Sequence, residues 1–91
     1  MSFEWDESKR LANIEKHGVD FRLAAAIFFG PTIEADDTRE DYGELRRPAL
    51  GRVGTEHLVV VYTLRGETKR LISAWKAGRH DRKRYQDLLG E

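Results

Sequence analysis

The sequence predicts an α+β domain in which two N-terminal helices pack on an antiparallel sheet and a C-terminal helix follows it. Residues 57–65 and 68–75 are apolar, β-branched runs separated by Gly66 and Glu67, which is typical of a β-hairpin. Apolar side chains occupy both alternating sets of positions in residues 58–64, so we expect this strand at the centre of the sheet. The helical patterns precede the strands instead of alternating with them, and this order favours antiparallel pairing.

Two helices are expected before the sheet, after a short strand at residues 2–5. Asp6 is a good N-cap for a helix that ends at about His17, and Asp20 can cap a second helix over residues 21–29. The positions expected to face inward are Leu11 and Ile14 in the first helix and Leu23, Ala24, Ile27 and Phe28 in the second.

Four meandering strands and a last helix are expected after this. The strand patterns cover residues 33–35, 47–53, 57–65 and 68–75. Residues 37–44 are polar and contain Tyr42 and Gly43, so they are expected to form a loop. The last helix begins near Gly78, and its thin apolar face consists of Tyr85, Leu88 and Leu89.

Length and composition indicate one small domain, residues 1–91. The chain has no cysteine, which excludes disulfides and thiolate metal sites and fits a reducing cytoplasm. The longest apolar run, residues 23–29, is far shorter than the roughly 20 residues that span a bilayer. Glu4 and Asp6 are not expected in a secretory signal, so we predict a cytoplasmic protein that does not associate with membranes.

Charge is unevenly distributed, although the net charge is zero. Residues 34–44 contain six acids and one base, whereas residues 65–85 contain eight bases and two acids. A basic C-terminal region suggests an anionic partner such as RNA, while a solvated helix face would explain it equally simply.

His17 is the best candidate for proton transfer, because histidine titrates near neutral pH and Lys16 beside it could hold a phosphate. Lys9, Asn13, Lys16 and His17 fall on one face of the first helix. The alternative is that Lys16 and His17 merely stabilise the C-terminal end of that helix. The other histidines, His57 and His80, are far apart in the sequence, so no metal-ligand spacing appears and no cofactor is expected.

Three separated stretches resemble the BrnT family. They are Phe3 to Asp6 with Lys9, Asn13, residues 16–19 and Phe21; residues 39–44 with Arg46; and residues 59–63 with Arg65, Gly66 and residues 70–74. The resemblance implies a RelE-like fold and a ribonuclease toxin of a bacterial type II toxin–antitoxin module. It also implies a DNA-binding, BrnA-like antitoxin as partner, with which the toxin would form a hetero-oligomer. Trp75 stands where the family usually has arginine, and Asp81 where it usually has glutamate.

This resemblance, combined with the residue chemistry, predicts a metal-independent endoribonuclease that inhibits translation. The predicted catalytic residues are Lys16, His17, Arg65 and Arg70. The predicted RNA-binding residues are Arg39, Tyr42, Arg46, Lys76, Arg79 and Arg82. Arginine offers planar, bidentate contacts to phosphate, and tyrosine can stack on a base. We expect Lys16 and His17 to approach the hairpin arginines, and Arg65, Arg70 and Arg79 to form one cationic surface.

Two other functions remain open at this stage. One is a nucleic-acid-binding module without catalysis, for which the basic C-terminal region would suffice. The other is a corepressor subunit that binds only its antitoxin.

Overall fold

The computed structural model describes residues 1–34, 39–41 and 44–90 and has an α+β fold. The elements in chain order are β1 (Ser2–Glu4), α1 (Glu7–His17), α2 (Phe21–Ala24), the 3-10 helix η1 (Ala25–Phe29), β2 (Ile33–Glu34), β3 (Arg39–Asp41), β4 (Glu44–Val53), β5 (Glu56–Arg65), β6 (Thr68–Lys76) and α3 (Arg79–Leu89). No helix in these ranges has the length and apolar character needed to cross a membrane.

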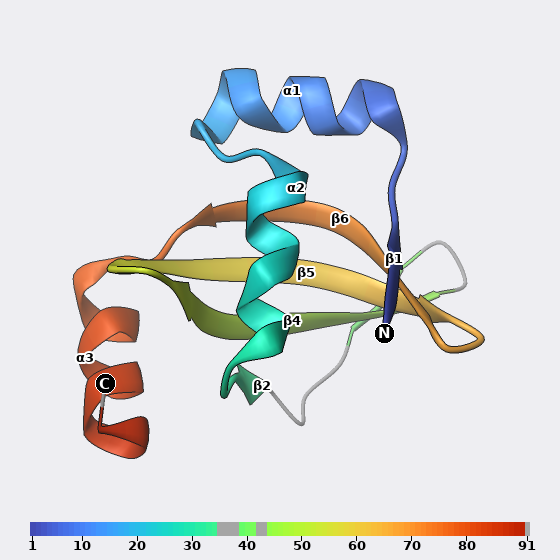
Figure 1. Ribbon diagram of the computed structural model, residues 1–91. Helices are drawn as coiled ribbons and strands as arrows, with labels where there is room; N and C mark the ends of the chain where they lie inside the picture. The colour runs from blue at the N-terminus through green and yellow to red at the C-terminus, as the bar shows by residue number, and fades with distance from the viewer. Residues whose placement is uncertain (35–38, 42–43, 91) are drawn as a thin grey trace.

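The sheet has the strand order β1-β6-β5-β4-β2, and β3 pairs with β4 beside this path (Figure 1). The prediction that residues 58–64 form a central strand is confirmed, because β5 lies between β6 and β4 and Val60 is fully buried. The predicted wholly antiparallel sheet is wrong. β1 pairs with β6 in parallel, while the other pairings are antiparallel. The long stretch of chain between β1 and β6, which contains the N-terminal helices and β2 to β5, permits this, because parallel neighbours cannot be joined by a tight turn.

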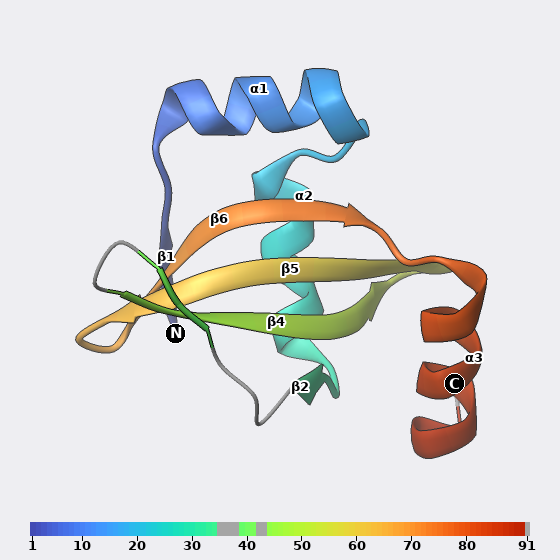
Figure 2. The ribbon, with the colours of Figure 1, turned by 180° about the vertical axis from the view of Figure 1, so that it is seen from behind.

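The core lies on both faces of β5. On one face, α2 and η1 pack across the sheet, as Figures 1 and 2 show from opposite sides. The main buried side chains of that cluster are Phe21, Ala24, Ile27, Phe28, Leu58, Val60, Tyr62 and Leu71. On the other face, α3 places Tyr85 against Leu50 and Val59 at one end of the sheet. Because α3 covers one end only, the α3 side has the smaller cluster.

The first helix contradicts the predicted inward positions. Leu11 is 55% exposed and Ile14 36% exposed, whereas Asn13 is the buried residue of α1. Figure 1 shows the reason: α1 lies beyond β6 at the edge of the sheet, not over its face. A helix at a strand edge meets backbone polar groups, so a polar side chain faces inward there. Leu23 of α2 is also 50% exposed, contrary to prediction.

Two further boundaries differ from the prediction. The second helix is α-helical only to Ala24 and then tightens into η1, where Ile27 and Phe28 are buried as expected. The stretch predicted as a polar loop, residues 37–44, contains β3, and β4 begins at Glu44 instead of residue 47. β3 and β4 thus form an additional antiparallel pair that the acidic composition did not suggest.

Asp20 joins the two N-terminal helices. Its carboxylate caps α2 by accepting from the Arg22 backbone N–H, as predicted, and also accepts from the Arg22 and Arg10 guanidinium groups. These contacts, those of Arg22 foremost, lower the pKa of Asp20 to about 2.

This pKa predicts an acid-sensitive contribution to stability. Because the folded pKa lies below the usual aspartate value of 3.8, the contribution is complete well above that value and is lost as the pH falls towards about 2. We expect Asp20→Asn to lower the free energy of unfolding by up to about 2 kcal/mol at about pH 5, and by less at about pH 3. Urea unfolding at both pH values measures the difference.

Asp87→Asn, which removes the exposed partner of Lys83, is the matched control and should have little effect at either pH. An Asp20→Asn deficit that does not shrink on acidification would contradict the assignment.

Candidate functional site

An open groove lies between the end of α1 and the end of β6. Its lining residues are Lys16 and His17 from α1 and Ser73, Trp75 and Lys76 from β6, and its volume is about 690 Å³. A second hollow of about 250 Å³ shares Lys16, His17 and Ser73 and extends along α1 to Lys9. We call both together the α1–β6 groove.

Asn13 fixes the position of this groove. Its Nδ2 donates to the backbone oxygens of Val19 and Ala74, each at 2.8 Å, and its Oδ1 accepts from the Ala74 N–H at 3.2 Å. The amide therefore takes the place of a neighbouring strand at the open edge of β6. Since Lys9, Lys16 and His17 flank Asn13 on the same helical face, this anchor brings them to the β6 edge.

The groove is positively charged and poorly neutralised. In the described part of the chain, no ion pair joins Lys9 or Lys16 to a carboxylate. Lys76 has only a distant, exposed contact with Glu56, at 3.8 Å. Exposed pairs of this kind contribute little energy, so these cations remain available to an anionic ligand.

His17 and Trp75 are the aromatic side chains of the groove. His17 lies in the last turn of α1 and is half-buried, and its ring centroid is 6.0 Å from that of Trp75 at an interplanar angle of 44°. Cations hold a phosphate, and an imidazole beside them can move a proton, so the groove has the parts for chemistry at a phosphodiester.

The hairpin arginines lie at the other end of β6. Arg70 is five residues before Trp75, about 16 Å along an extended strand, and Arg65 pairs with Thr68, farther away still. Each arginine is already bound to a carboxylate: Arg65 to Glu44 at 2.9 Å and Arg70 to Glu4. The prediction that Lys16 and His17 approach these arginines is therefore wrong. The parallel β1–β6 pairing supplies Glu4 as a partner that the sequence pattern did not reveal.

The predicted residues of the last helix lie beyond the groove. Arg79 is exposed in the first turn of α3, at the end of the sheet opposite the hairpin, and Arg82 donates to the Ala77 backbone oxygen at 3.0 Å. Arg65, Arg70 and Arg79 therefore do not form one cationic surface, contrary to prediction.

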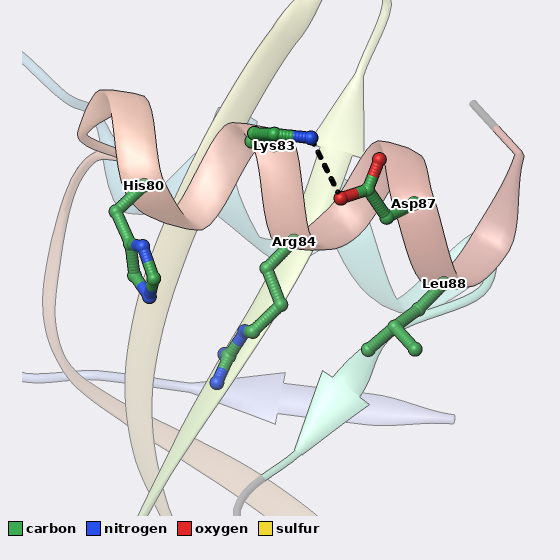
Figure 3. Close-up of a pocket in the computed structure, with 5 residues that line it drawn as sticks. All are labelled: His80, Lys83, Arg84, Asp87 and Leu88. Carbon is green, nitrogen blue, oxygen red and sulfur yellow. Dashed lines mark hydrogen bonds and ion pairs between the residues drawn. The ribbon is translucent and has the colours of Figure 1, made fainter.

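A further hollow, of about 410 Å³, lies on α3 itself. Figure 3 shows His80, Arg84 and Leu88 along one side of the helix, while Lys83 is paired with Asp87 at 3.0 Å. All the residues that line it come from one helix, and none of them is a predicted catalytic residue. We therefore regard the α1–β6 groove as the stronger candidate.

The remaining predicted residues belong to the β3–β4 region. Arg39 in β3 pairs in register with Arg46 in β4, close to Glu44 and hence to the hairpin end of the sheet. Tyr42 lies outside the described residues. Of the ten predicted site residues, the groove unites Lys16, His17 and Lys76.

The predicted site omitted several residues of the groove, among them Lys9, Ser73 and Trp75. The helical period does place Lys9 on the same face as Lys16 and His17. Ser73 and Trp75 are two positions apart, so the strand period places them on the same face of β6. This periodicity can be read from the sequence. The groove, however, also requires α1 to lie beside β6, which the sequence pattern does not predict.

Comparisons with known proteins agree with the fold. The family model described as "Ribonuclease toxin, BrnT, of type II toxin-antitoxin system" matches residues 5–81. The chain is similar in structure to the Brucella abortus ribonuclease toxin BrnT, with a TM-score of 0.70 and 30% sequence identity, over 87% of this chain and 99% of that one. No curated protein gives a significant sequence match. Because the family model covers most of the sequence, the chain belongs to the BrnT family of type II toxin–antitoxin ribonuclease toxins.

Proposed function

We propose that this protein is a toxin endoribonuclease that cleaves RNA in the α1–β6 groove and thereby inhibits translation. The observation that carries the proposal is the meeting of Lys16, His17 and Lys76 around one open hollow. The hairpin arginines, by contrast, each pair with a carboxylate and lie at the other end of β6. Family membership supports the reaction class, and the groove supports the location.

The reaction follows from these groups. The ribose 2′-hydroxyl attacks the neighbouring phosphorus, the P–O5′ bond breaks, and the products are a 2′,3′-cyclic phosphate and a free 5′-hydroxyl. His17 moves a proton at one of the two oxygens, while Lys16 stabilises the negative charge that develops on the phosphorane. Because the titrating and cationic groups come from the chain itself, we propose that cleavage does not require a metal ion.

The proposed partner is a DNA-binding, BrnA-like antitoxin. It neutralises the toxin in the cytoplasm by covering the groove and forms a hetero-oligomer with it. The proposed relationship to RelE-like toxins rests on the α+β architecture of helices packed on a sheet.

Induced expression in a sensitive bacterium tests the proposal. We expect growth arrest with fragmented RNA, and rescue when the neighbouring antitoxin gene is co-expressed. The purified protein should cleave RNA equally well in the presence of a chelator. Salt-sensitive RNA binding without cleavage would instead support a non-catalytic RNA-binding protein.

Lys16→Ala tests whether RNA binds in the α1–β6 groove. It should weaken RNA binding across sequences and reduce the slope of log K against log salt by about one. Lys83→Ala removes another exposed lysine, on α3, and is the matched control. If both variants behave alike, RNA does not bind in the α1–β6 groove.

A further inference from the structure

The Trp75 side chain contacts both the hydrophobic core and the open groove. It packs against the cluster of Leu50, Val59 and Tyr85, and it also lines the open groove. In the β5–β6 ladder it pairs with Val59, so the strand fixes its position. The indole is thus held firmly by the core while part of it remains accessible, because the residue is only half-buried.

The His17 ring lies beside this indole at a tilted angle. Aromatic pairs gain most from offset-stacked or edge-to-face geometry. The His17 and Trp75 rings adopt neither, since their planes meet at 44° and their centroids are 6.0 Å apart. The contact with His17 is thus not a stack, and the half-buried indole still lines the open groove.

The groups around Trp75 limit what that planar group is. Lys16 and Lys76 lie in the same groove, and Ser73, two positions earlier on β6, adds a hydroxyl. An indole surface beside two cations fits a ligand that carries a flat ring and a phosphate, and a nucleotide has both.

We propose that Trp75 is the base-stacking residue of the enzyme, holding the base of the nucleotide next to the cleaved phosphate. This inference rests on the proposed function and adds a preference to it. Stacking accepts every base, but larger ring systems offer more surface, so a purine is favoured modestly over a pyrimidine at that one position. Trp75 thereby sets substrate preference while Lys16 and His17 act on the phosphate.

Tryptophan fluorescence tests the contact directly. The chain has two tryptophans, so Trp5→Phe leaves Trp75 as the only one. In this background, a short single-stranded 2′-deoxy oligonucleotide, which lacks the attacking hydroxyl, should quench the emission. An abasic strand of equal length and charge should not quench it and should bind about 5- to 150-fold more weakly.

Equal quenching and equal affinity for both strands would overturn the proposal. Trp75→Phe, which retains only Trp5, is the control and should show no quenching.

Cleavage kinetics provide the second measurement. Trp75→Leu keeps an apolar side chain against the core but removes the aromatic face, so KM should rise by about 5- to 150-fold with a smaller change in kcat. Trp75→Phe should restore KM to within a few-fold of the parent. A thermal melt shows that each variant is folded, and a folded Trp75→Leu protein with the parental KM would refute the role.

The two measurements separate this inference from the proposed function. Base-dependent quenching without RNA cleavage would support stacking on Trp75 and refute the proposed endoribonuclease activity. RNA cleavage without any base dependence would retain the activity and remove Trp75 from substrate recognition.

Discussion

Asn13→Leu is expected to destabilise the protein by about 3 kcal/mol or more. The leucine has nearly the same size but leaves three backbone groups without their partner: the Val19 oxygen, the Ala74 oxygen and the Ala74 N–H. Each buried polar group left unsatisfied costs about 1–3 kcal/mol, and partial exposure to water after the change keeps the sum below the maximum. A loss of this size is a large fraction of the ~5–15 kcal/mol that holds a small domain together.

Chemical denaturation measures this loss, and Glu15→Leu is its matched control. Glu15 is an exposed residue of the same helix, so its replacement should change the free energy of unfolding by less than about 0.5 kcal/mol. Asn13→Leu should also weaken RNA binding, because α1 would no longer hold Lys16 and His17 against β6. If Asn13→Leu and Glu15→Leu are equally stable, the amide does not anchor the helix.

The same residue explains how far sequence reasoning could reach. The β5–β6 hairpin was predictable, because its apolar periodicity and its turn are local properties of residues 57–75. The starts of the two N-terminal helices were also local, since Asp6 and Asp20 cap as their chemistry suggests. The inward face of α1, by contrast, is not determined by the local sequence. The usual rule assigns Leu11 and Ile14 to the core, but a helix at a strand edge needs an amide there.

The candidate site divides in the same way. Lys16 and His17 were predicted from a helical face and a resemblance, and both line the α1–β6 groove. Arg65 and Arg70 were assigned from charge and motif, yet each is bound to a carboxylate supplied by a distant part of the chain. Glu4 is 66 residues from Arg70, and only the parallel β1–β6 pairing brings them together. Composition therefore identified the basic residues, but it could not show which of them pair with a carboxylate in the folded chain.

His17→Gln is expected to lower the rate of RNA cleavage on the order of 10²-fold. The structure places His17 in the groove beside Lys16 and Trp75, where a phosphodiester held by the lysines would lie within reach of the imidazole. General acid–base catalysis typically contributes 10²–10⁴-fold, and glutamine has hydrogen-bonding groups but cannot move the proton. The fold should survive, because a side-chain contact with the C-terminal end of a helix contributes only about 0.3–1 kcal/mol.

Comparison with His80→Gln separates catalysis in the groove from a general effect of replacing a histidine. His80 is an exposed histidine on α3, outside the α1–β6 groove, so its replacement should leave cleavage at the parental rate. The pH dependence gives a second test, because a proton-transferring histidine makes the rate vary near neutral pH and His17→Gln should flatten that variation. A folded His17→Gln protein that cleaves RNA at the parental rate with an unchanged pH profile would exclude His17 from the chemistry. Charge stabilisation by Lys9, Lys16 and Lys76 would then have to account for the reaction, since these cations line the same groove and do not depend on the imidazole.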